Sequence, residues 1–99
     1  MDKDEIRRVV LNMIDSTERD NAELEISDVT EWQNDFADYK SDVTIGGVDP
    51  SVKITNTRWH EGNGYHIEFN SSEGDGKDKK KELVIEKNDV RTYLIIGFK

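Results

Sequence analysis

The segment 82–98, ELVIEKNDVRTYLIIGF, predicts two paired strands near the centre of a sheet. Its two apolar stretches, 82–86 and 90–98, are separated by Asn88–Asp89, and these residue types tolerate the backbone conformation of a tight hairpin turn. Successive apolar residues in both stretches would point to opposite faces of a strand, and a strand with two apolar faces is usually buried on both sides. We therefore expect this hairpin to lie in the middle of the sheet.

Other strand signals in the chain are shorter. Residues 65–70 alternate apolar and polar side chains, and the turn sequence Glu61-Gly62-Asn63-Gly64 precedes them, which is typical of a hairpin. Residues 71–81 are polar and predict a loop. The remaining predicted strands are 23–27, 42–45 (ended by Gly46-Gly47) and 51–60.

Residues 3–20 predict a helix at the start of the chain. Asp2 is placed to cap it, with Glu5 three residues later as in a capping box. The apolar residues recur at the spacing of one buried helix face, namely Ile6, Val9, Val10, Met13 and Ile14.

Residues 28–40 have two interpretations, a second helix or an irregular hairpin. Apolar residues step by three and four positions at Val29, Trp32, Phe36, Tyr39 and Val43, and acidic residues do the same beside them. Such parallel stripes are typical of a helix, although Asp, Asn, Thr and Val are mediocre helix formers. We favour the helix, and we expect Trp32, Phe36 and Tyr39 to lie in the core rather than in an interface.

Together these signals predict an α+β fold. An N-terminal helix, joined by a second helix if 28–40 is helical rather than a hairpin, would pack on a four- to five-stranded antiparallel meander sheet. The length of 99 residues predicts a single domain, 1–99.

Composition excludes several classes of function. The chain has no Cys, so disulfide frameworks and thiol chemistry are excluded. A net charge of −8 argues against direct contact with nucleic acid, which needs a basic surface. No apolar run approaches the roughly 20 residues of a membrane span, and the start Met-Asp-Lys-Asp-Glu lacks a signal sequence. We expect the cytoplasm, or the host cytoplasm if the gene is viral.

The negative charge is concentrated in the first half of the chain. Residues 1–50 contain 14 acidic and 5 basic side chains, whereas residues 51–99 contain 8 and 9. Either this acidity only keeps the protein soluble, or it recognises a basic protein partner, in one version by imitating the phosphates of nucleic acid. The candidate partner-binding residues are Asp28, Glu31, Asp35, Asp38 and Asp42, with Glu18, Asp20, Glu23 and Glu25 as a second group.

We therefore expect a small binding protein of the inhibitor, immunity or anti-defence type, with no enzyme activity and no cofactor. Three alternatives stay open: a structural or assembly module that binds by a sheet edge, a homodimer through the basic run 77–81, and a ligand carrier lined by Trp59, Tyr65 and Phe69. The calcium-loop frame at 71–82 lacks the first Asp, and His60 and His66 would point to opposite faces of a hairpin. No metal site is expected.

Overall fold

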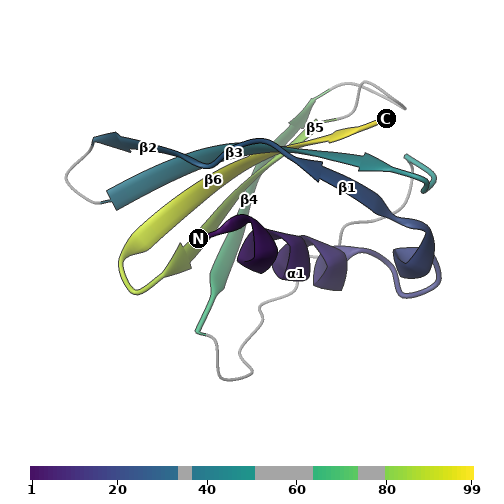
Figure 1. Ribbon diagram of the computed structural model, residues 1–99, viewed down its shortest axis with the longest axis horizontal. Coiled ribbons are helices and arrows are strands. Elements are labelled where there is room, and N and C mark those ends of the chain that lie inside the picture. The colour runs from purple at the N-terminus through teal and green to yellow at the C-terminus, as the bar shows by residue number, and fades with distance from the viewer. Residues whose placement is uncertain (34–36, 51–63, 74–79) are drawn as a thin grey trace.

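Strands β5 (Lys80–Lys87) and β6 (Val90–Phe98) form an antiparallel hairpin in the computed structural model, which describes residues 1–33, 37–50, 64–73 and 80–99. Asn88 and Asp89 form the turn with positive φ angles of 54° and 63°, as two-residue hairpin turns require. β6 is the central strand of the sheet, between β3 and β5 (Figure 1). The predicted hairpin and its central place are confirmed.

Six strands form one sheet in the described residues. The strand order is β1-β3-β6-β5-β4, and β2 also pairs with β3. β1 and β2 lie end to end along the same edge of β3, because β3 uses residues 43–46 for β1 and residues 37–40 for β2. The bounds of these strands are β1 Glu23–Ile26, β2 Thr30–Gln33, β3 Ala37–Gly46 and β4 His66–Glu73.

The predicted antiparallel meander of four to five strands is wrong in detail, although the α+β class is confirmed. β3 and β6 run parallel, and Asp38–Ile45 pair in register with Arg91–Phe98. The sheet is therefore mixed, with β4, β5 and β6 as an antiparallel meander added to β3. Apolar patterning indicates that a strand is central but does not reveal which strand lies beside it or in which direction.

The predicted helix at 28–40 is also wrong. Residues 30–33 and 37–40 are paired strands, joined by the undescribed residues 34–36. The physical reason is that β3 has neighbours on both edges, so strand hydrogen bonds satisfy its backbone on both sides. The alternating three- and four-residue spacing of the aromatic and acidic residues was therefore not caused by a helix.

Helix α1 (Lys3–Met13) is shorter than predicted. Asp2 caps it as expected, since the Glu5 backbone N–H donates to the Asp2 carboxylate at 2.8 Å. The helix ends at Met13 because Ile14 is extended, and the Asp15 carboxylate then accepts the Thr17 backbone N–H at 2.9 Å in a local turn. A short 3₁₀ helix, η1 (Arg19–Asn21), leads into β1.

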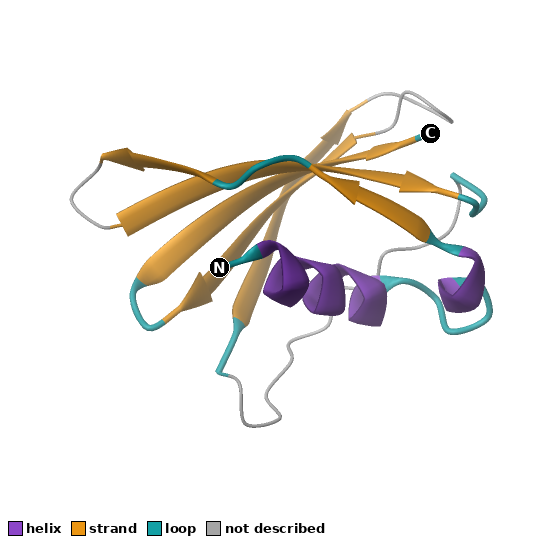
Figure 2. Cartoon of the chain, viewed as in Figure 1, coloured by secondary structure: helices purple, strands orange, loops and turns teal. Residues whose placement is uncertain are grey.

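The main hydrophobic core lies between α1 and one face of the sheet (Figure 2). The helix residues Ile6, Val9, Val10 and Met13 are buried, as their spacing predicted. They pack with apolar side chains from the central strands, which include Val43, Ile45, Leu83, Ile85, Leu94 and Ile96. Within the described residues, no helix covers the other face of the sheet.

Gly47 closes β3 in a conformation that other residues rarely adopt. Its φ is +77°, and a Cβ there would lie 2.1 Å from the Asn21 carbonyl oxygen. Gly47→Ala should therefore lower the unfolding free energy by at least about 1–2 kcal/mol, since the clash adds to the left-handed backbone penalty. Urea unfolding checks this value. The control is Gly97→Ala, which meets no atom within 4 Å and should be close to neutral; equal losses for the two variants would contradict the prediction.

Candidate functional site on the open face of the sheet

The sheet face that points away from α1, called here the open face, is formed by alternate residues of each strand. On β6, Leu94 and Ile96 are buried towards the helix, so Tyr93 and Ile95 point the other way. Directly paired residues of neighbouring strands lie on the same face, and the register pairs Lys40 with Tyr93 and Asp42 with Ile95. The open face is therefore partly apolar and partly charged.

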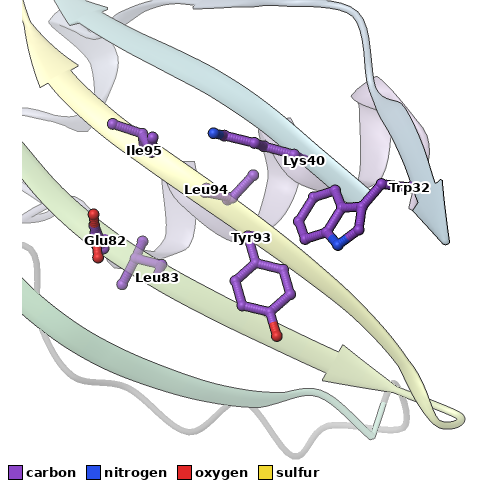
Figure 3. A pocket seen from close by; sticks show the side chains of 7 residues that line it. All are labelled: Trp32, Lys40, Glu82, Leu83, Tyr93, Leu94 and Ile95. Atoms are coloured by element: carbon purple, nitrogen blue, oxygen red, sulfur yellow. The ribbon is translucent and has the colours of Figure 1, made fainter. Parts of the chain in front are cut away.

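Trp32 and Tyr93 form an aromatic pair on this face. Their ring centroids are 5.1 Å apart with an angle of 40° between the planes. The pair borders a groove with a cavity volume of about 390 Å³ (Figure 3). The residues that line this groove are Trp32, Lys40, Glu82, Leu83, Tyr93, Leu94 and Ile95.

A second, more polar hollow adjoins the groove. Its volume is about 250 Å³, and it shares Trp32 and Lys40 with the groove. Residues with hydroxyl or carboxylate groups provide most of its remaining lining, namely Ser27, Asp28, Thr30, Ser41 and Asp42. The two hollows together run across the strands, from β5 over β6 and β3 to the β1–β2 junction.

A buried ion pair lies beside the aromatic pair. Arg91 donates from Nε to Asp38 Oδ1 at 3.1 Å and from Nη2 to Oδ2 at 3.3 Å. The Asp38 side chain is 0% exposed and that of Arg91 is 29% exposed. Asp38 is the register partner of both Trp32 and Arg91, so the three side chains share one row of the open face. Its carboxylate is buried against Arg91 and is not presented to a partner.

Exposed carboxylates predominate among the described charged residues of the open face, although the groove itself is lined by one carboxylate and one ammonium group. Glu82 lines it directly, and Asp42 lies on the other side of Ile95, about 10 Å from Glu82 across two strand spacings. Other exposed acids on the same face are Glu23, Glu68 and Glu86, together with Glu25, which is paired with Lys99 at 3.0 Å. Lys40 is the cation that lines the groove itself.

The first group of predicted partner-binding acids does not form one row. Asp28 lies in the loop between β1 and β2 and pairs with Lys3 at 2.8 Å. Glu31 is exposed on β2 but faces the helix side, because it pairs with Tyr39. Asp38 is buried and Asp42 is exposed on the open face, whereas Asp35 lies outside the described residues. The geometric basis of the row is therefore absent, and partner binding by these residues stays a prediction.

The second group of predicted partner-binding acids is also divided between two parts of the surface. Glu18 precedes η1 and is partly buried, and Asp20 is exposed within η1. Glu23 and Glu25 lie on β1 opposite Gly46 and Thr44, which places them on the open face with Asp42. Three exposed acids of the two predicted groups, Glu23, Glu25 and Asp42, thus share a surface with the aromatic groove.

Sequence reasoning missed the groove and misplaced Trp32. We expected Trp32 in the core, but it lies on the open face against Tyr93. In the sequence, the apolar residues Tyr93 and Ile95 alternate with Leu94 and Ile96, and this pattern predicts a strand that is buried on both faces. Only the structure shows that the helix covers one face, which leaves Tyr93 and Ile95 on the open face.

The residues of the alternative ligand and metal sites lie away from the groove or outside the described residues. Tyr65 and Phe69 belong to the core side, where Tyr65 is 3% exposed, and Trp59 lies outside the described residues. His66 pairs with Glu68 at 2.9 Å, and His60 is also outside the described part. In the described residues, no three His, Cys, Asp or Glu side chains are grouped to hold a metal ion. The calcium-loop frame at 71–82 overlaps the ends of two strands, since β4 runs to Glu73 and β5 begins at Lys80.

Comparisons of the chain with protein-family models, with curated proteins and with solved structures find no match. Among the residues that the structure describes, neither helix has the length and apolar composition needed to cross a membrane.

The buried ion pair predicts a stability effect. Arg91→Leu removes the guanidinium from a carboxylate that stays buried, which should cost about 3–5 kcal/mol of unfolding free energy. Asp38→Asn/Arg91→Leu should be less destabilised, because no charge is left behind. Denaturant unfolding followed by circular dichroism measures both variants. Arg8→Leu, at an exposed helix position, is the control; a loss at Arg91 no larger than at Arg8 would refute the role of the pair.

The contact between α1 and the β1–β2 loop predicts a titration effect. The hydrogen bond and the charge of Lys3 lower the pKa of Asp28 below its usual value. Since the folded pKa is lowered, the pair stabilises the fold above the usual Asp pKa, and this stabilisation is lost as pH falls through the lowered pKa. Lys3→Met should raise the pKa of Asp28, and Lys3→Arg should preserve it. Carboxyl-carbon NMR titration tests this; an unchanged pKa in Lys3→Met would exclude the contact in solution.

Proposed function

We propose that this protein is a small, acidic, non-enzymatic binding protein whose open sheet face covers a basic site on a protein partner. The observation that supports it best is the groove of Trp32 and Tyr93 next to exposed carboxylates, on the face that α1 leaves uncovered. Aromatic residues supply binding energy in the centre of interfaces, and a charged border supplies steering and selectivity. A partner that covers this face would be blocked at its own basic site without any chemistry.

Charge supports a basic partner over a second copy of the chain. Among the described residues, the exposed acids of the open face outnumber its cations. The acids are Glu23, Glu25, Asp42, Glu68, Glu82 and Glu86, and the cations are Lys40, Lys80, Lys99 and the Arg91 that is paired with Asp38. Two copies placed face to face would bring like charges together, which is unfavourable. The assembly alternative is therefore the weaker one. Light scattering over a concentration series tests it, because self-association would raise the measured mass with concentration.

Imitation of nucleic acid is not part of this proposal. That idea required carboxylates one helical turn apart over 28–40, and the described residues 30–33 and 37–40 are strands instead. What remains is an acidic surface with an aromatic centre, which suits a protein partner with exposed Lys or Arg side chains.

Two triple variants with the same charge change test the proposal. Glu23→Gln/Asp42→Asn/Glu82→Gln removes three negative charges from the open face. Asp4→Asn/Asp20→Asn/Glu31→Gln neutralises exposed acids elsewhere and is the control. Each tagged protein captures partners from lysate of its natural source at low and at high salt. Affinities for the purified partner are then compared.

The expected result is a basic protein that the wild type and the control triple retain at low salt. The open-face triple should bind it about 10–100-fold more weakly, with a smaller salt dependence, because surface carboxylates act mainly through steering. Equal weakening in both triples would mean that net charge alone matters and would overturn the assignment of the face. Recovery of a salt-insensitive partner, or of this protein alone, would overturn the electrostatic mechanism.

A further inference from the structure

The central strand β6 carries a short apolar row on the open face, called here the β6 ridge. Tyr93 and Ile95 point to this face, and Gly97 continues the row without a side chain. A Cβ at Gly97 would meet no atom within 4 Å, so the ridge ends in open space. An interior glycine in a strand often marks a place where another backbone approaches closely. The ridge is about 13 Å long, which equals about nine residues of an α-helix.

Carboxylates flank the β6 ridge on both sides. Asp42 of β3 and Glu82 of β5 are the two register partners of Ile95, so the Cα of each lies about 5 Å from the Cα of Ile95. Both acids are exposed, and among the described residues neither takes part in an ion pair. Figure 3 shows Ile95 on β6, with Glu82 on the neighbouring strand β5. This row of the sheet therefore has an apolar centre with a negative charge on each side.

The parallel pairing of β3 with β6 favours a helix as the element that covers this ridge. Parallel strands are usually covered on both faces, and helices are the usual cover. Helix α1 covers one face, and within the described residues no helix covers the other. An amphipathic helix along β6 would place its apolar stripe on the ridge and the polar borders of that stripe beside the flanking acids.

An extended partner segment suits the ridge less well than a helix does. Successive side chains of a strand point to opposite faces. A strand whose apolar side chains contact the ridge would therefore direct the intervening charged side chains away from Asp42 and Glu82. A helix presents both kinds of side chain to the same surface, because charged residues border its apolar stripe.

We propose that the open face binds an amphipathic helix of a protein partner, laid along the β6 ridge, with basic side chains on its two borders beside Asp42 and Glu82. This inference rests on the proposed function and names the element that the partner presents. Lys40 lines the same groove, so a basic side chain next to it is unfavourable. Lys40→Gln should therefore bind such a helix more tightly, whereas it would bind an acidic ligand more weakly.

Two peptides of equal composition and charge separate the helix from general electrostatics. Acetyl-LKKLLKLLKKLLKL-amide has its leucines on one helical face, and acetyl-LKLKLKLLKLKLKL-amide alternates like a strand. Each is titrated into the full chain by calorimetry at low salt. We expect the helical peptide to bind at least about fivefold more tightly. Amide chemical shifts of the ¹⁵N-labelled protein should then change along β6 and in its neighbours β3 and β5, and not in α1.

Variants then locate the site. Asp42→Asn/Glu82→Gln should weaken binding of the helical peptide at least about threefold and reduce its salt dependence. Asp20→Asn/Glu31→Gln has the same charge change at exposed positions away from the ridge and is the control. Ile95→Thr keeps a β-branched strand residue and should weaken binding about threefold or more with no change in salt dependence. If Ile95→Thr fails to fold by circular dichroism, the charge pair of variants carries the test.

The outcomes distinguish this inference from the proposed function. Equal affinity for the two peptides, with shift changes on the open face, would overturn the helix and leave an acidic binding face in place. Equal weakening by the two double variants would overturn the position of the helix beside Asp42 and Glu82. Weaker binding in Lys40→Gln, shift changes confined to α1, or absence of binding by either peptide would count against both proposals.

Discussion

The parallel pairing of β3 with β6 is the constraint on which the rest of this structure depends. Eight residue pairs, from Asp38–Arg91 to Ile45–Phe98, join two parts that are each antiparallel. Among the described strands, β1 and β2 pair only with β3, and β4 and β5 connect to the sheet only through β6. Without this pairing the sheet would divide into two three-stranded pieces, and α1 would lose part of the sheet face that it covers.

The Asp38–Arg91 ion pair helps to fix the register of this pairing. A shift by one residue would place Asp38 opposite Thr92, which is buried on the helix side of the sheet. Because side chains alternate between faces, such a shift would separate the two charges and move apolar residues out of the core. A buried ion pair adds little stability by comparison with apolar side chains, so its clearest contribution here is to specify one register.

The candidate site also depends on this pairing. Trp32 and Lys40 belong to the β1–β2–β3 part, whereas Tyr93, Ile95 and Glu82 belong to the β4–β5–β6 part. The groove therefore forms only when β3 and β6 are correctly aligned. A binding surface built across the junction of two parts is complete only in the folded protein, which suits recognition through a rigid face rather than through a loop.

The sequence by itself determined the local elements and the side of the helix that is buried. The period of the apolar residues set α1, Asp2 set its cap, and Asn88–Asp89 set the hairpin turn, because each depends on residues close together in the chain. Composition also fixed the net charge of −8, but not its arrangement on the surface.

Only the tertiary structure decided that residues 30–33 and 37–40 are strands, and that β3 lies parallel to β6. The pairing of β3 with β6 joins residues more than 50 positions apart in the chain, and neither helical spacing nor strand propensity contains that information. The same pairing buried Asp38, divided the predicted acids between two faces and brought Trp32 to Tyr93. The site could not be predicted because its residues share a surface only after the distant strands have paired.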